Sequence, residues 1–313
     1  MDFEFDLLSG EELSKVDQYI GMKGKEGQTP ITDLAIINGS LSTPVDGENF
    51  GCFWTKDRLT DITVGVSDTP GFNGFCYDDR RYPAIKPVIR NEALFDKLVQ
   101  TGISTENGTD FGEFGEYPQF AVSQSLHEKL DELHKSKSLQ LTGAVYTFDS
   151  LVEDHINGEK FDGFIPVTYN EYEFEGKKYV RIPRLYNFFN RSLSNGMSKF
   201  DRDYFWLEVT PVKWMVLKEQ KMLIAENGLV SGLNFGIGRS FEESFIKKYL
   251  DSYFIHDLLQ HSDEELLIEQ KTEIEKGECR DLKSKIAMLF KKKKAVENKV
   301  CPEGPTIAPR RLR

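Results

Sequence analysis

The chain has 313 residues, of which 39% are hydrophobic and 29% are charged, and its formal net charge is −11. This length suffices for one large domain or two small ones with a buried core. The apolar runs are far shorter than a membrane span, and the acidic N-terminus differs from the basic, apolar start of a signal peptide. We therefore expect a cytoplasmic protein without a membrane partner.

The sequence contains four cysteines, namely Cys52, Cys76, Cys279 and Cys301. They form no C-x-x-C pair and therefore predict neither a disulfide framework nor a zinc site. No other cofactor is indicated. The negative charge is unevenly distributed, because residues 291–313 carry +6 and the first 290 residues carry −17. An acidic body repels nucleic acid, so any phosphate-binding surface on it must be local.

The N-terminal third has helix signals at both ends and a loop-rich stretch between them. Ser9–Glu12 is a capping box, which predicts a helix over residues 10–20. Residues 31–41 are typical of a strand or a short helix. Between residues 46 and 82, glycines interrupt short aromatic pieces, which indicates short strands joined by exposed loops. Asn91 then predicts the start of another helix.

The middle of the chain predicts strands and one helix. Residues 111–122 (FGEFGEYPQFAV) are typical of a strand that opens a new unit. Ser125 with Glu128 predicts the start of a helix. Residues 164–185 predict a hairpin that turns at Glu175-Gly176.

Residues 204–230 form the ribbon around which the chain is expected to be organised. Large apolar side chains, including two of the three tryptophans, alternate on both of its faces. Trp214 is therefore expected to be buried. Pro211 cannot donate a hydrogen bond to a β-ladder, so a bulge or a sheet edge is expected there.

Beyond the ribbon, Ser240 with Glu243 predicts the start of a strongly amphipathic helix, and Ser262 begins a polar helical arm that leads into a basic tail. These patterns together predict an α+β fold, a mixed sheet with flanking helices and long irregular loops. The expected division is a body, residues 1–260, and a helical arm with the basic tail, residues 262–313. The body has an N-terminal part, 1–105, which contains the loop-rich segment 46–90, and a second part, 106–260.

Few residues indicate chemistry. Gly232–Ser240 leads from a strand into a helix, as phosphate loops do, but it lacks the first glycine and the lysine of a P-loop. His127 and His134 are seven residues apart rather than four, so they predict solvated helix residues and no metal site. No pair of carboxylates can be singled out as acid and base, and no catalytic residue is assigned.

A loop surface is the remaining candidate for ligand binding. Its residues combine aromatic rings with Arg, Lys, Asp and Asn, a composition typical of binding surfaces: Trp54, Lys56, Asp57, Arg58, Phe72, Asn73, Phe75, Tyr77, Arg80 and Arg81. The alternative is that the aromatic residues fill the core of an irregular β unit while the charged residues face water.

Three segments occur in a characteristic order: GEYPQ at Gly115–Gln119, VTPVKWMVL at Val209–Leu217 and SFIKKYLDSYF at Ser244–Phe254. They resemble an uncharacterised bacterial family with a G-x-YPQ opening strand and a later xxWxVL strand. The resemblance implies a C-type-lectin-like fold, related to the formylglycine-generating-enzyme superfamily, whose loops commonly bind protein or sugar. The nearest matches to the last two family strands, residues 51–57 and 84–89, precede GEYPQ here, which implies a permuted order or a separate N-terminal part.

The leading hypothesis is a non-enzymatic recognition protein of bacterial or mobile-element origin that presents this loop surface to a protein partner. One rival is a phosphate-handling enzyme that uses Gly232–Ser240. The other is a nucleic-acid-associated protein that uses the basic tail. The tail contacts in that case are Lys291, Lys292, Lys293, Lys294, Arg310, Arg311 and Arg313.

Overall fold

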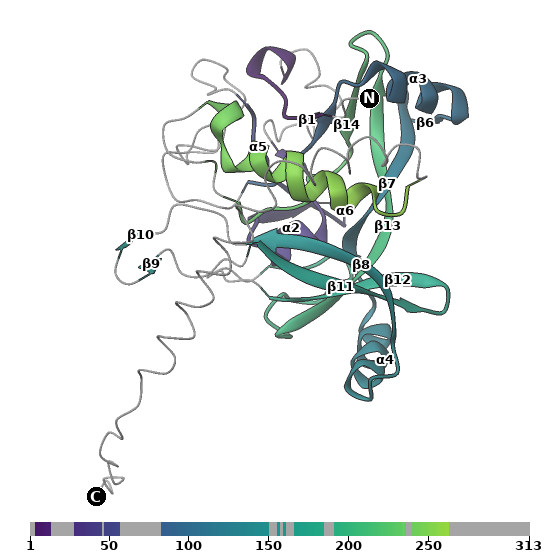
Figure 1. The fold of residues 1–313 in the computed structure, drawn as a ribbon, viewed down its shortest axis with the longest axis vertical. Helices are drawn as coiled ribbons and strands as arrows, with labels where there is room; N and C mark the ends of the chain where they lie inside the picture. Colours follow the sequence, from purple (N-terminus) through teal and green to yellow (C-terminus); the bar gives the residue numbers. More distant parts are fainter. Residues whose placement is uncertain are drawn as a thin grey trace, which may run out of the picture. The chain divides into compact units, whose positions relative to one another are not determined.

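The computed structural model describes residues 4–13, 28–45, 47–56, 83–149, 155–156, 159–160, 166–184, 191–233, 235 and 240–262. These residues all belong to one compact unit, Asp2–Ser262. The fold is α+β, with a large antiparallel sheet and few helices (Figure 1). In this part of the chain, no helix is long and apolar enough to cross a membrane. The predicted arm and tail lie outside the described residues, apart from Ser262.

The large sheet has nine strands among the described residues, in the order β1-β5-β14-β13-β12-β11-β8, and β7 pairs with β13 and β6. Their bounds are β1 Phe5–Asp6, β5 Val88–Ile89, β6 Ser104–Glu106, β7 Thr109–Ala121, β8 Gln140–Asp149, β11 Pro166–Phe174, β12 Lys177–Pro183, β13 Tyr204–Leu217 and β14 Met222–Ala225. A smaller sheet, β2-β4-β3, consists of β2 Gln28–Pro30, β4 Glu48–Cys52 and β3 Ser42–Val45, and β9 His155–Ile156 pairs with β10 Glu159–Lys160.

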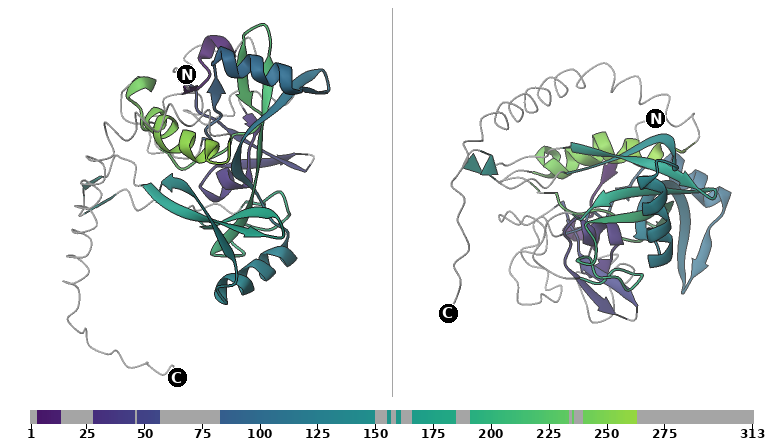
Figure 2. Two further views of the ribbon diagram at one scale, coloured as in Figure 1. Left: turned by 45° about the vertical axis from the view of Figure 1, so that its right-hand side comes forward. Right: turned by 90° about the horizontal axis from the view of Figure 1, so that it is seen from below.

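The helices are short. They are α2 Asp33–Ile37, α3 Glu92–Thr101, α4 Gln124–Lys135, the 3-10 helix η1 Phe241–Glu243, α5 Phe245–Tyr249, the π-helical turn η2 Leu250–Phe254 and α6 Ile255–Leu259. The last three form one continuous helix, which crosses one side of the large sheet, while α2 and the small sheet lie on the other side (Figure 2, right).

Strand β13 is the spine of the sheet. Strand β7 pairs along one edge of it, while β12 and then β14 pair along the opposite edge. In the first half of β13, Leu207 pairs with Ala121 of β7 and Val180 of β12. In the second half, Trp214 pairs with Gly112 of β7 and Ala225 of β14. The β7 register shifts between Pro211 and Lys213. The predicted bulge at the proline is therefore confirmed, because an imide nitrogen cannot continue the ladder.

Several local predictions are confirmed. The Ser9 hydroxyl accepts a hydrogen bond from the Glu12 amide at 3.2 Å, and the Glu12 carboxylate accepts one from the Ser9 amide at 2.8 Å, which is a capping box. Asn91 caps α3 through the Leu94 amide at 2.9 Å. Glu175 and Gly176 both have positive φ, 51° and 74°, as a two-residue hairpin turn between β11 and β12 requires.

Two predicted helix starts are wrong. Helix α4 is capped by Ser123, whose hydroxyl accepts the Leu126 amide, rather than by Ser125. Ser240 precedes only the 3-10 turn η1 and makes no side-chain cap hydrogen bond, whereas the Ser244 hydroxyl accepts the Lys247 amide at 3.0 Å and caps α5. In both cases another serine, two or four residues away in the sequence, makes the cap hydrogen bond.

The C-terminal helix closes the outer edge of β8. The Asp257 carboxylate accepts the Thr147 amide at 2.6 Å, and the Tyr249 hydroxyl donates to the Thr147 carbonyl at 3.1 Å. The side-chain carbonyl of Gln260 accepts the Val145 amide at 3.1 Å. These side chains occupy the hydrogen-bonding groups that an edge strand would otherwise present to another chain.

The buried Asp257 should make stability depend on pH. Burial raises the pKa of this carboxyl to about 6, so its contribution to stability is greatest below pH 4 and is lost as the pH rises through 6. Asp257→Asn keeps an acceptor for the Thr147 amide but has no charge. Relative to this variant, the wild type should lose about 2–3 kcal/mol of unfolding free energy between pH 4 and pH 8. Urea denaturation at several pH values would measure this, and parallel profiles would contradict it.

Candidate functional site: an arginine–aromatic surface

Of the residues expected to form a loop surface, the structure describes two. Trp54 is only 1% exposed and packs on Phe235, with ring centroids 5.4 Å apart, so it is a core residue and not a surface contact. This corrects the expectation for Trp54 in favour of the core-filling alternative, because packing on Phe235 removes the apolar surface of the indole ring from water. Lys56 is partly exposed. The others lie outside the described residues: Asp57, Arg58, Phe72, Asn73, Phe75, Tyr77, Arg80 and Arg81.

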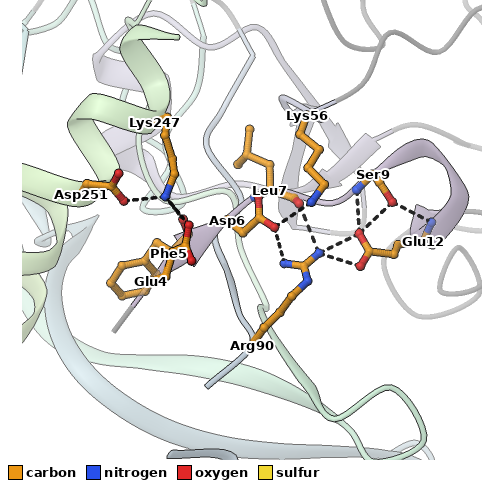
Figure 3. Close-up of polar contacts among 10 residues, drawn as sticks. All are labelled: Glu4, Phe5, Asp6, Leu7, Ser9, Glu12, Lys56, Arg90, Lys247 and Asp251. Carbon is orange, nitrogen blue, oxygen red and sulfur yellow. Dashed lines mark hydrogen bonds and ion pairs between the residues drawn. The ribbon is translucent and has the colours of Figure 1, made fainter. Parts of the chain in front are cut away.

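Lys56 belongs to an ion network that holds the N-terminal segment (Figure 3). Its ammonium group lies 2.9 Å from the Asp6 carboxylate, which also pairs with Arg90 at 2.8 Å. Arg90 in turn contacts Glu12 at 2.7 Å. Although partial burial acts in the opposite direction, hydrogen bonds from Arg90 and Ser9 lower the pKa of Glu12 to about 2. The network ties the first strand and helix start to β5, which is a structural role.

The other predicted sites give no chemistry in the described residues. Leu233 and Phe235 of the glycine-rich loop are buried, residues 234 and 236–239 are not described, and neither are the tail contacts Lys291–Arg313. Burial raises the pKa of the Cys52 thiol to about 12, so it is not a thiolate at neutral pH. No group of three potential metal ligands occurs among the described side chains.

His127 is not solvated, which corrects its prediction, whereas His134 is partly exposed. His127 is buried, and its Nε2 lies 3.0 Å from the Tyr204 carbonyl oxygen. Burial, and the positive charge of Arg202, lower the pKa of His127. His134 stacks edge-on against Tyr172 and Trp206, at 5.5 and 5.7 Å. Both rings help pack α4 onto the sheet.

A shallow, open depression of about 270 Å³ lies between β7, β13 and the end of the C-terminal helix, with Glu113, Pro211 and His261 in its wall. His261 Nε2 lies 2.8 Å from the carboxylate of Glu171, a fully buried residue, and the Tyr146 hydroxyl donates to the same oxygen at 3.0 Å. This pairing fastens the helix end to β11. A truncation intended to keep the body intact should therefore follow Ser262 rather than Gln260.

A second candidate site lies next to a short hairpin, residues 191–199, which precedes β13. Its strands are joined by hydrogen bonds between Lys199 and Arg191, at 2.9 Å, and between Leu193 and Met197, at 2.8 Å. The buried carboxylate of Asp33, the first residue of α2, accepts hydrogen bonds from the Ser194 amide at 2.8 Å and the Ser194 hydroxyl at 2.6 Å. The hairpin is thus fixed to a helix about 160 residues earlier in the sequence.

Two exposed aromatic rings follow this hairpin in the sequence. Each ring lies against the guanidinium group of an arginine, one on β12 and one directly after it. The Arg181 guanidinium carbon lies 3.8 Å from the centre of the Tyr204 ring, and that of Arg184 lies 4.9 Å from the centre of the Phe200 ring. Both distances are within the range of cation–π attraction. Phe200 and Tyr204 are 42% and 43% exposed. We call these four residues, with Arg202, the arginine–aromatic surface.

Asp131 of α4 pairs with two of the arginines, Arg181 and Arg202. It accepts a hydrogen bond from Trp206 Nε1 at 2.9 Å and lies 3.4 Å from Arg181 and 3.9 Å from Arg202. Burial opposes the effect, but the Trp206 hydrogen bond and the charges of His127 and Arg181 lower the pKa of Asp131. A carboxylate that stays ionised holds both guanidinium groups in place, which reduces the entropy that they lose on binding a ligand.

Sequence reasoning did not select this surface. The signal that could have found it is KFDRDYF at Lys199–Phe205, where aromatic and charged residues alternate immediately before the buried ribbon. Its partner arginines, Arg181 and Arg184, lie on β12 or directly after it, and the pairing of β12 with β13 in the sheet brings the two segments together. Comparisons with protein-family models, curated proteins and solved structures gave no match.

Proposed function

We propose that the chain is a non-enzymatic recognition protein with a C-type-lectin-like body, and that it binds a protein partner through the arginine–aromatic surface. The observation that carries the proposal is the pair of exposed rings, Phe200 and Tyr204, each stacked against an arginine. Aromatic residues and arginine are the side chains most enriched at the energetic centres of protein interfaces.

The two rings are large apolar groups that are partly exposed to solvent, and each lies against an arginine. The hairpin that precedes them is anchored by Asp33, and β13 continues from Tyr204 into the core. A partner would therefore meet surfaces that lose little conformational entropy on binding. The phosphate-enzyme rival has less support, because Leu233 and Phe235 of its loop are buried, although Ser240 at the end of the loop is exposed.

The C-type-lectin-like part of the proposal rests on how the resemblance motifs lie. GEYPQ is on β7 and VTPVKWMVL is on β13, and Tyr117 pairs with Thr210 in the sheet. Val88 and Ile89 of AIKPVI pair with β14 beside them, as a permuted strand order would require. The predicted contact residues between Asp57 and Arg81, and the basic tail, stay in the proposal as further contact regions.

A double substitution, Phe200→Ala with Tyr204→Ala, tests the proposal. The partner is first identified by affinity capture from the native host and mass spectrometry, and its affinity is then measured by calorimetry with the purified protein. Removing two hot-spot rings should weaken binding by roughly 30-fold or more, equivalent to about 2 kcal/mol.

The matched control is Leu141→Ala, which removes an apolar side chain that is 54% exposed on β8, a strand that β11 separates from β12 in the sheet. It should bind the partner with wild-type affinity. Thermal melts should show all three proteins folded. A double variant that is folded and binds with wild-type affinity would overturn the assignment of this surface.

A further inference from the structure

The arginine–aromatic surface borders a buried lysine whose environment differs from that of the other buried lysines. The Lys199 side chain is 0% exposed, and its ammonium group makes one long hydrogen bond, 3.4 Å to the Ile36 carbonyl oxygen at the end of α2. No carboxylate of the described residues forms an ion pair with it. Burying an ammonium group without a counter-charge is strongly unfavourable, because the lost hydration is not replaced by an opposite charge.

Two other buried lysines show how this protein normally satisfies such a group. Lys86 donates to the Thr29 hydroxyl at 2.8 Å and to the Glu226 carbonyl at 2.5 Å. Lys247 lies 2.7 Å from Glu4 and 2.8 Å from Asp251. Lys199 has neither two close acceptors nor a carboxylate.

The groups around Lys199 are also cationic. The Phe200 ring has the Lys199 ammonium 6.0 Å from its centre and the Arg184 guanidinium 4.9 Å from it. Arg191 is joined to Lys199 through the backbone of the hairpin. Burial, followed by the charges of Arg191 and Arg184, lowers the pKa of Lys199 to about 7. The ion pair that Arg184 forms among the described residues is with the highly exposed Asp203, at 3.4 Å, so the charge of Arg184 is only weakly compensated.

Asn38, at the C-terminal end of α2, is a further buried polar residue with unsatisfied side-chain atoms. It is 1% exposed, and neither its side-chain nitrogen nor its side-chain oxygen has a hydrogen-bond partner. Its backbone lies two residues beyond Ile36, whose carbonyl oxygen accepts the Lys199 ammonium, and its amide donates to the Leu34 carbonyl at 2.9 Å. A buried amide without partners is unusual and indicates a place where a ligand completes the hydrogen bonding.

We propose that Lys199, Arg184 and Asn38 form a binding site for one carboxylate of an acidic side chain on the partner protein. This inference rests on the proposed function, because the site adjoins Phe200 of the arginine–aromatic surface. The carboxylate meets Arg184 at the exposed rim, and the four-carbon stem of Lys199 lets its ammonium group turn from Ile36 toward it. The protein's net charge of −11 disfavours an extended nucleic-acid backbone, and a carboxylate is the anion that the side chains of a protein partner supply.

The first test measures stability without a partner. Lys199→Met keeps the length of the side chain and removes its charge. If the lysine is held without a counter-charge for binding, the full-length variant should melt several degrees higher than the wild type at pH 6. Lys129→Met, at an ion-paired lysine that also lies over an aromatic ring, should change the melting temperature little. A Lys199→Met protein less stable than wild type would assign the lysine a structural role and overturn the proposal.

The second test uses acetate as the probe, with phosphate and chloride at equal ionic strength. NMR titration of the full-length wild-type protein should show acetate shifting the Lys199 side-chain resonance, with a Kd in the millimolar range, roughly tenfold or more below that of chloride. Lys199→Met identifies the resonance. Acetate that binds no better than chloride would overturn the site, and phosphate that binds at least tenfold tighter than acetate would overturn the carboxylate assignment.

The two proposals can fail separately. Loss of partner binding in the Phe200 and Tyr204 variant with no acetate response at Lys199 would retain the recognition surface and remove the carboxylate site. In the opposite case, acetate shifts the Lys199 resonance, but the Phe200 and Tyr204 variant binds the partner as the wild type does. That result would retain an anion site at Lys199 and overturn the arginine–aromatic surface as the partner's binding site. The assignment of the anion to a protein carboxylate would then fall as well, because it depends on that surface.

Discussion

Trp214→Ala should lower the free energy of unfolding by about 3–5 kcal/mol, as large-to-small changes of buried aromatic residues do. The side chain is fully buried in the C-terminal half of β13 and stacks on Phe5, with ring centroids 6.2 Å apart. Its indole nitrogen donates to the Phe114 carbonyl at 2.8 Å. The substitution therefore leaves a cavity and removes this hydrogen bond.

Urea denaturation followed by circular dichroism would measure this effect. Trp214→Phe should lose roughly half as much, because it keeps a ring but removes the hydrogen bond. Tyr204→Ala, at an exposed position of the same strand, should change the free energy of unfolding by less than about 1 kcal/mol. An unfolding midpoint of Trp214→Ala equal to that of the wild type would show that this part of β13 is not the core.

Asp33→Ala is the second substitution with a large expected effect, again about 3–5 kcal/mol. The carboxylate is 1% exposed and accepts hydrogen bonds from the Ser194 amide, the Ser194 hydroxyl and the Ala121 amide, the last at 2.9 Å. Alanine leaves all three donors without their acceptor. Burial raises the pKa of this carboxyl, so desolvation already offsets part of the gain from these hydrogen bonds.

Asp33→Asn separates the hydrogen bonds from the charge. It keeps one acceptor oxygen without a buried charge, so it should lose clearly less stability than Asp33→Ala. Hydrogen exchange at the Ser194 amide should accelerate in the alanine variant, because the hairpin tip loses its anchor. Asp203→Ala, at a highly exposed aspartate, is the matched control and should stay within about 0.5 kcal/mol of wild type. Wild-type exchange at Ser194 in Asp33→Ala would show that the hairpin is held by other contacts.

The sequence by itself determined the elements whose signals are local. The Ser9–Glu12 capping box, the Asn91 cap and the Glu175-Gly176 turn each involve residues within a few positions of one another, so their hydrogen bonds and φ angles follow from the residue types present. The bulge at Pro211 follows from the missing amide hydrogen. The burial of Trp214 follows from an alternating apolar pattern that only a sheet with two covered faces satisfies.

Only the tertiary structure decided which polar and aromatic residues face water. Trp54 and Tyr204 are both aromatic residues beside charged ones in the sequence, yet Trp54 packs on Phe235 and Tyr204 lies exposed against Arg181. Asp33 reaches Ser194 and Lys199 reaches Ile36 across about 160 residues of chain. Burial and charge pairing depend on these long-range neighbours, and no periodicity along the chain encodes which segments the sheet will place together.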